Sequence, residues 1–174
     1  MDFFISGESR NDSFPLSSIV SDELNLIQKL EDDKLDLGKY DYDFNYLSCF
    51  KKWLSESDTG LIDKYFEIVS RDRLCPAALE KYELPFIDFF RNIFLNGEIC
   101  IIFSKNENSS FFKPKSEKEF LTYIVMGLRE IQLYSFYDLK NKVFFIPLRD
   151  LTLLVATPKN SSLDLKGIKL HVLD

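Results

Sequence analysis

The stretch "PFIDFFRNIFLNGEICIIFS", from Pro85 to Ser104, contains a helix pattern and a strand pattern that meet at one glycine. The helical part has an apolar face made of Phe86, Phe89, Phe90, Ile93 and Phe94. Pro85 suits the first turn of a helix, and Gly97 suits the position just after its last turn. The residues that follow, "EICIIFS", are rich in β-branched and aromatic side chains, which favours a buried strand. This stretch therefore predicts a helix that leads directly into a sheet.

Further elements are predicted on the N-terminal side of this stretch. Residues 2–6 ("DFFIS") have the pattern of a short opening strand. Apolar residues then recur close to helical spacing in residues 17–30, in residues 46–57 and in residues 58–71. Such spacing places the apolar side chains on one face of a helix, where they are available to a core. The N-terminal half is therefore predicted to be mostly helical.

The C-terminal side is predicted to contain one more helix and several strands. Residues 116–131 begin with Ser116 and a glutamate three positions later, the spacing of a capping box. Dense apolar segments at residues 142–148, 151–157 and 168–173 are separated by polar turns and read as strands. We therefore predict an α+β fold, with a helical N-terminal half packed on a mostly antiparallel C-terminal sheet.

Length and composition are those of a globular protein with an uneven charge. The chain has 174 residues, which suits a single domain over residues 1–174. Residues 1–87 contain 18 acidic and 10 basic residues, a net charge of −8, whereas residues 88–174 contain 10 acidic and 12 basic residues, a net charge of +2. A net negative chain repels nucleic acid at long range and attracts basic proteins. The layout therefore favours a basic protein partner over nucleic acid.

The acidic residues concentrate beside a row of aromatic rings. Residues 31–43 contain six acids and two bases, and rings follow at every second position from Tyr40 to Tyr46. In an extended strand the rings would share one face and the acids the other. Interfaces favour tyrosine, and acidic rims accelerate encounter with a basic partner, although an edge strand with a solvated charged face has the same pattern. The candidate partner-binding residues are Asp32, Asp33, Asp36, Tyr40, Asp41, Tyr42, Asp43 and Tyr46.

Signatures of catalysis are weak, so we predict no catalytic residue, no metal site and no cofactor. His171 is the only histidine, and it lies near the end of a predicted strand. The D/E-x-K element of many nucleases is matched at Asp164–Lys166, but also at Asp32–Lys34 and at Asp138–Lys140, so the pattern discriminates poorly. A metal-dependent enzyme that uses Asp164 and Lys166 therefore stays an alternative to a binding protein.

The cysteines and the N-terminus indicate a cytoplasmic location. The three cysteines, Cys49, Cys75 and Cys100, are odd in number and lack the spacing of metal ligands, which favours buried, reduced thiols. The N-terminus lacks the basic and long apolar regions of a signal peptide. No apolar run approaches the length of about 18 residues that a membrane span needs. We therefore expect no contact with a membrane.

The small, acidic, aromatic-rich chain resembles the immunity proteins of bacterial toxin systems, including contact-dependent inhibition and other polymorphic toxins. Within it, "ELPFIDFFRNIFLNG" (residues 83–97) is similar to a stretch of SUKH-superfamily immunity proteins. The matching positions are Leu84, Pro85, Phe90, Asn96 and Gly97. The resemblance implies binding of a cognate toxin domain in the cytoplasm, with its active site blocked, and many such toxins are nucleases with basic grooves. A regulator that mimics the charge of nucleic acid is an alternative.

Overall fold

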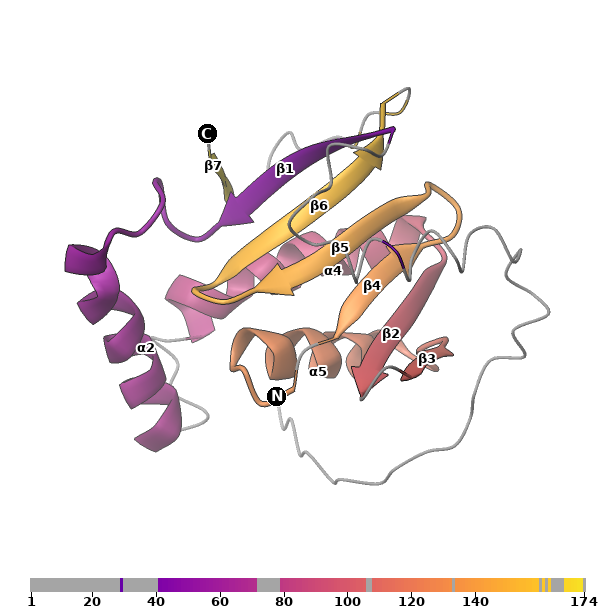
Figure 1. Cartoon of the computed structure of the whole chain (residues 1–174). Coiled ribbons are helices and arrows are strands. Elements are labelled where there is room, and N and C mark those ends of the chain that lie inside the picture. Colours follow the sequence, from indigo (N-terminus) through magenta and orange to yellow (C-terminus); the bar gives the residue numbers. More distant parts are fainter. Residues whose placement is uncertain are drawn as a thin grey trace.

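A computed structural model describes Lys29 and residues 41–71, 79–105, 108–132, 134–159, 161, 163 and 168–173 (Figure 1). The predicted strand at residues 2–6 and all of the predicted helix at residues 17–30 except Lys29 lie outside these residues. Seven strands form one sheet in the order β3-β2-β4-β5-β6-β1-β7, and every neighbouring pair is antiparallel. The predicted α+β fold is thus confirmed.

The elements have the following bounds. The strands are β1 (Tyr42–Ser48), β2 (Ile99–Lys105), β3 (Asn108–Phe112), β4 (Ser135–Asp138), β5 (Val143–Leu148), β6 (Thr152–Pro158) and β7 (His171–Leu173). The α-helices are α2 (Thr59–Arg71), α4 (Leu84–Asn96) and α5 (Glu117–Leu128). A 3₁₀ turn, η3 (Glu56–Asp58), precedes α2, and a π-helical turn, η4 (Leu79–Glu83), leads into α4.

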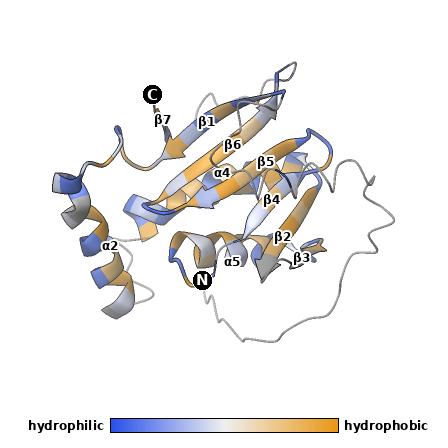
Figure 2. Ribbon diagram, viewed as in Figure 1, coloured by the Kyte–Doolittle hydropathy of each residue, from blue (hydrophilic) through white to orange (hydrophobic). Residues whose placement is uncertain are grey.

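Both faces of the sheet are apolar (Figure 2). Successive residues of a strand point to opposite faces, and the central strands have hydrophobic residues at successive positions. Helices α4 and α5 pack against one face (Figure 1). The rings of Phe90 and Phe120 from these helices lie 5.5 Å from the ring of Phe136 in β4, measured between centroids. The opposite face carries a second apolar cluster, made of Cys100, Ile102, Phe111, Tyr137, Phe144, Ile146, Leu154 and Ala156.

The α4–β2 junction confirms the prediction for residues 85–104 and explains its glycine. Gly97 has extended backbone angles (φ −106°, ψ −174°), so a left-handed conformation does not require it. A Cβ atom at Gly97 would instead lie 2.5 Å from Oδ2 of Asp138. The Oδ1 atom of this buried carboxylate accepts hydrogen bonds from the backbone N–H groups of Glu98, Lys140 and Asn141. Glycine is therefore needed for a close approach that joins the helix to the β4–β5 turn.

Helix α5 begins at the predicted cap. Ser116 has extended backbone angles, and its Oγ accepts a hydrogen bond of 3.2 Å from the N–H of Glu119. The Glu119 carboxylate accepts from the N–H of Lys115 at 2.6 Å, one residue before the position that a standard capping box uses. The bond from the Ser116 hydroxyl satisfies one of the backbone donors that a helix leaves open at its start.

A buried ion pair between Glu83 and Arg129 is joined to α2 by a hydrogen bond from Tyr65. The Glu83 side chain has no exposed surface, and it accepts hydrogen bonds from Nε and Nη2 of Arg129 at 2.7 Å and 3.0 Å. The same carboxylate accepts from the hydroxyl of Tyr65 in α2 at 2.9 Å. Burial, followed by the charge of Glu83, raises the pKa of Tyr65 far above its usual value. These bonds satisfy a charge that would be costly to bury alone.

Two segments differ from the sequence-based predictions. The helix predicted at residues 46–57 is wrong: residues 46–48 belong to β1, and only η3 within this range is helical. The alternation of Tyr42, Phe44 and Tyr46 continues into Leu47 and Ser48 and gives a strand that pairs with β6 on one side and, at its end, with β7 on the other. Strand β4 was not predicted, because it has four residues between a helix and a turn.

Candidate partner-binding surface

The structure describes four of the eight residues predicted to bind a partner. Asp41 immediately precedes β1, and Tyr42, Asp43 and Tyr46 lie within it. The other four predicted residues, Asp32, Asp33, Asp36 and Tyr40, lie outside the described residues. The site therefore has to be built from β1 and from what surrounds it.

Acids and rings separate on β1 as the alternation predicts. Asp43 is exposed, and the Asp41 side chain is 83% exposed, with its carboxylate 3.1 Å from Nζ of Lys159. Tyr42 and Tyr46 are half-buried and pack against the second apolar cluster. The rings thus anchor β1 to the sheet while both carboxylates face solvent. Because Lys159 balances Asp41, the described end of the acidic stretch is less negative than the sequence alone suggests.

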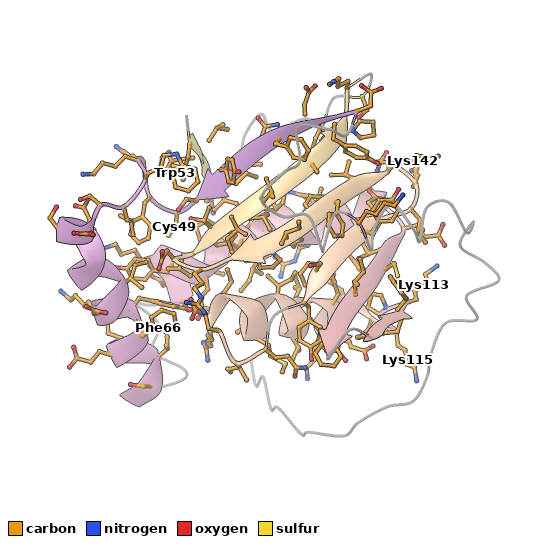
Figure 3. The ribbon with its side chains drawn as sticks, in the orientation of Figure 1. Cys49, Trp53, Phe66, Lys113, Lys115 and Lys142 are labelled. Carbon is orange, nitrogen blue, oxygen red and sulfur yellow. The ribbon has the colours of Figure 1, made fainter. Side chains whose placement is uncertain are left out.

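Trp53 extends the row of rings to the molecular surface (Figure 3). It follows β1 in an irregular segment, and its side chain is 46% exposed. Its ring contacts that of Tyr46 edge-on, with centroids 4.9 Å apart and planes at 65°. The helix predicted at residues 46–57 would place Trp53 on its apolar face, so Trp53 is not among the predicted binding residues. Its polar neighbours in "KKWLSES" were the available signal for exposure.

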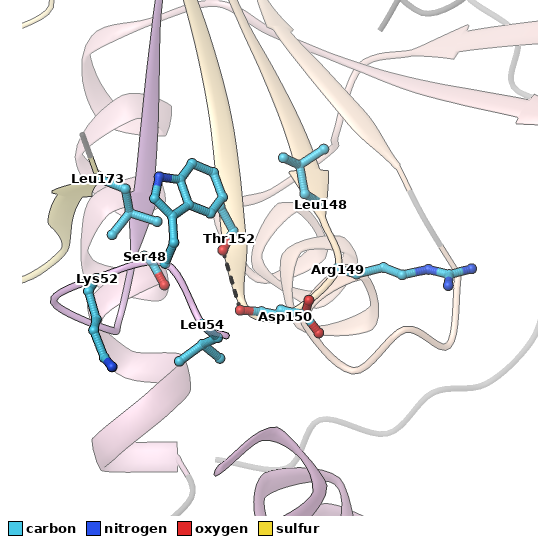
Figure 4. A pocket seen from close by; sticks show the side chains of 9 residues that line it. Ser48, Lys52, Leu54, Leu148, Arg149, Asp150, Thr152 and Leu173 are labelled. Carbon is cyan, nitrogen blue, oxygen red and sulfur yellow. Dashed lines mark hydrogen bonds between the residues drawn. The ribbon is translucent and has the colours of Figure 1, made fainter. Parts of the chain in front are cut away.

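A pocket of about 220 Å³ opens beside Trp53, on the sheet face that carries the second apolar cluster (Figure 4). It lies where the end of β1 meets the β5–β6 turn and β7. The residues around it are Ser48, Lys52, Trp53, Leu54, Leu148, Arg149, Asp150, Thr152 and Leu173. We call this the Trp53 pocket. Large aromatic side chains next to concave, partly apolar surfaces are the features that protein interfaces use as anchors.

The base of the Trp53 pocket is held by one buried hydroxyl. The Ser48 Oγ atom donates to the carbonyl oxygen of Leu151 at 3.0 Å and accepts from the N–H of Phe50 at 3.1 Å. These bonds join the end of β1 to the β5–β6 turn, although Ser48 and Leu151 are 103 positions apart. Asp150 and Leu151 in this turn have φ angles of 64° and 53°, a region that L-residues other than asparagine and aspartate seldom adopt. The buried side chain of Leu151 helps to hold this strained turn in place.

The charges at the Trp53 pocket are unequally engaged. Nζ of Lys52 lies 3.1 Å from Oδ2 of Asp58, which also accepts bonds from the hydroxyl and the N–H of Ser55. The hydrogen bonds from Ser55, followed by Lys52, lower the pKa of Asp58 to about 2. Figure 4 shows the Arg149 guanidinium directed away from the other side chains of the pocket. Neither Arg149 nor Asp150 makes an ion pair with any residue that the structure describes.

The residues considered for catalysis do not come together in the described structure. Asp138 and Lys140 belong to the α4–β2 junction, where Nζ of Lys140 donates to the carbonyl of Asn96 at 2.9 Å. His171 lies half-buried at the start of β7. Asp164 and Lys166 fall outside the described residues. Among the residues that are described, no cluster of three or more histidine, cysteine or acidic side chains could hold a metal ion.

The described cysteines are free thiols in apolar surroundings. Cys100 is buried in the second apolar cluster, and Cys49 is half-buried against the helix side of the sheet. Burial raises the pKa of each thiol to about 12. Both described cysteines are unpaired, as predicted, although only Cys100 is fully buried, and Cys75 lies outside the described residues.

Within the part of the chain that the structure describes, no helix has the length and apolarity to cross a membrane. Comparison with protein-family models, with curated proteins and with solved structures gave no significant match to this chain.

Proposed function

We propose that this chain is a protein-binding inhibitor of the immunity type, which binds a basic toxin domain in the cytoplasm and blocks its active site. The observation that carries the proposal is the exposed Trp53 ring, which is held against Tyr46 beside a pocket. Trp53 follows β1, the strand that contains Asp43 and that Asp41 immediately precedes. Tryptophan and tyrosine are enriched among the residues that dominate binding energy. The acidic N-terminal half, with its net charge of −8, favours a basic partner.

The two parts of this surface have different expected roles. Exposed carboxylates steer a basic partner toward the surface, and this effect falls as salt screens the charges over about 8 Å at physiological ionic strength. A ring that fits into the partner slows dissociation instead. The carboxylates should therefore affect the association rate constant, and Trp53 should affect the dissociation rate constant.

Photocrosslinking from the surface itself tests the proposal. A photoreactive amino acid would replace Arg149, at the rim of the Trp53 pocket, in the full chain expressed in its source cells. As a control the same amino acid would replace Leu95, whose side chain is 65% exposed near the end of α4. We expect a basic protein to be captured from position 149 and not from position 95. We also expect this protein to arrest growth when expressed alone and to be harmless when this chain is co-expressed.

Other outcomes would favour the alternatives. A captured nucleic-acid-binding protein whose expression is harmless would support a regulator that mimics nucleic-acid charge. Turnover of a substrate that depends on Asp164 and Lys166, both outside the described residues, would support the metal-dependent enzyme. Capture of the same protein from both positions, or failure of co-expression to restore growth, would contradict an inhibitory role for this surface.

Surface plasmon resonance with the captured protein then tests the two roles. The acidic variant replaces Asp32, Asp33, Asp36, Asp41 and Asp43 with asparagine, and the ring variant is Trp53→Ala. We expect the acidic variant to associate more slowly and with weaker salt dependence, and the ring variant to dissociate faster. If the acidic variant has the association rate and salt slope of the parent, the acidic stretch is only a solvated surface.

A further inference from the structure

We propose that the Trp53 pocket receives an arginine or lysine side chain of the partner protein, with the cationic group paired to Asp150. This inference rests on the proposed function, because it specifies which part of a basic partner the surface recognises. The proposed occupant matches three properties of the pocket: its aromatic and aliphatic wall, its available carboxylate and its fixed shape.

The wall of the pocket suits the long side chain of a basic residue. Trp53, Leu54 and Leu148 line it with apolar surface. Arginine and lysine have aliphatic stems that cover such surface while their charged groups stay near water. Tryptophan is also the most favourable ring for a cation, and guanidinium groups stack on its face. An aliphatic partner side chain would use the wall but would leave the nearby carboxylate without a counter-charge.

The pocket offers an incoming cation one carboxylate that is not already paired. Lys52 is engaged by Asp58 at 3.1 Å, and the Arg149 guanidinium points away from the pocket (Figure 4). Asp150 lines the pocket and, like Arg149, takes part in no ion pair among the described residues. An incoming guanidinium or ammonium would therefore find an acceptor without first displacing a cation of this chain.

The turn that carries Asp150 is held in one arrangement. Asp150 lies between paired strands β5 and β6, with Leu148 and Thr152 facing each other across the turn. The bond from Ser48 to Leu151 ties the turn to β1, and the Thr152 hydroxyl donates to the Asp150 carbonyl at 3.3 Å. A carboxylate presented by a fixed backbone loses less freedom on binding than one on a loose loop.

A peptide selection on the purified full chain tests this proposal without the cellular partner. The probe is a displayed library of random linear peptides, and binding is read from the fluorescence of Trp53, the only tryptophan of the chain. Asp150→Asn removes the charge but keeps the fold, because asparagine also tolerates a positive φ. Asp63→Asn is the matched control, since it removes an exposed carboxylate from α2, outside the pocket and outside the predicted binding residues.

We expect the selected peptides to share an arginine or lysine and to change the emission of Trp53. Asp150→Asn should weaken their binding about tenfold, the loss expected when an ion pair at an interface is removed while the Trp53 contact remains, and Asp63→Asn should leave it within about twofold. Peptides without a basic residue, equal binding by the Asp150→Asn variant, or no peptide that alters Trp53 emission would overturn the proposal. If basic peptides are selected but crosslinking captures no toxin, the proposed function is rejected and the cation site is kept. If crosslinking captures a toxin but no basic peptide is selected, the proposed function is kept and the cation site is rejected.

Discussion

Replacing Gly97 with alanine should destabilise the protein strongly, for a reason that the structure makes quantitative. The added methyl carbon would lie 2.5 Å from Oδ2 and 2.8 Å from Cγ of Asp138, and 2.8 Å from the carbonyl oxygen of Ile93. The Ile93 carbonyl is part of the backbone of α4, which cannot move freely. The Asp138 side chain is the more mobile neighbour, and it has to be displaced to make room for the methyl group. Its carboxylate would then lose bonds from the N–H groups of Glu98, Lys140 and Asn141 and from the Asn141 side chain.

The size of the loss follows from those four bonds. Hydrogen bonds to a charged group contribute about 1.5–3 kcal/mol each, but a displaced carboxylate regains part of this from water. We therefore expect Gly97→Ala to lower the free energy of unfolding by about 2–4 kcal/mol. Gly60 in α2 is a matched control, because a Cβ atom there would meet no atom within 4 Å. Gly60→Ala should raise the free energy of unfolding by up to about 1 kcal/mol, as alanine favours helix.

Urea denaturation of the parent and the two variants measures both changes. The dependence of the unfolding free energy on urea concentration should stay constant, so that the shift in midpoint reports stability alone. If Gly97→Ala lowers the free energy of unfolding while Gly60→Ala raises it, the loss at Gly97 is caused by the contact with Asp138 and not by the added methyl group as such. A Gly97→Ala variant within about 0.5 kcal/mol of the parent would refute the steric argument.

Three further predictions concern buried and titrating groups. Glu83→Gln should cost about 3 kcal/mol in urea denaturation, because it leaves the partly buried Arg129 without a counter-charge; a loss below about 1 kcal/mol would contradict the buried ion pair. Asp58 should titrate near pH 2 by NMR, and because its pKa is lowered, its stabilising contribution should be present above about pH 4 and be lost as the pH falls through 2. Cys49 and Cys100 should react slowly with iodoacetamide in the folded chain and rapidly in urea, because burial raises their pKa to about 12; equal rates in both conditions would show that the thiols are accessible.

The fold was predictable where one local pattern dominated. Residues 85–104 have a strong helical face, a proline near the start and a glycine at the end, and the structure has α4 and β2 there. Residues 46–57 carry two patterns at once, because the alternation that ends at Ser48 overlaps with apolar residues at helical spacing. Pairing with β6 decides between them, and that strand lies about 110 positions later in the chain. Local spacing contains no information about such a partner.

The candidate site was predictable only in its strand. The acids and rings of β1 separate onto two faces as the alternation implies, and this needs no tertiary information. The Trp53 pocket, in contrast, depends on Trp53 and Asp150, which come from distant segments joined through Ser48 and Leu151. The sequence of the β5–β6 turn also gives no sign that Asp150 is held at a positive φ.

The binding surface and the core of this protein use different atoms of the same strand. Leu47 of β1 is fully buried on the helix side of the sheet, and Tyr46 contributes to the opposite face while its ring supports Trp53. Asp43 faces solvent, so its charge can change without removing a packed atom. Because exposed carboxylates contribute little to stability, the acids are free to be selected for encounter with a partner. The ring of Tyr46 is not free to change in the same way, because it packs against the sheet and also supports Trp53. A change at Tyr46 should therefore alter stability and partner binding together, whereas changes at Asp43 or Asp150 separate the two.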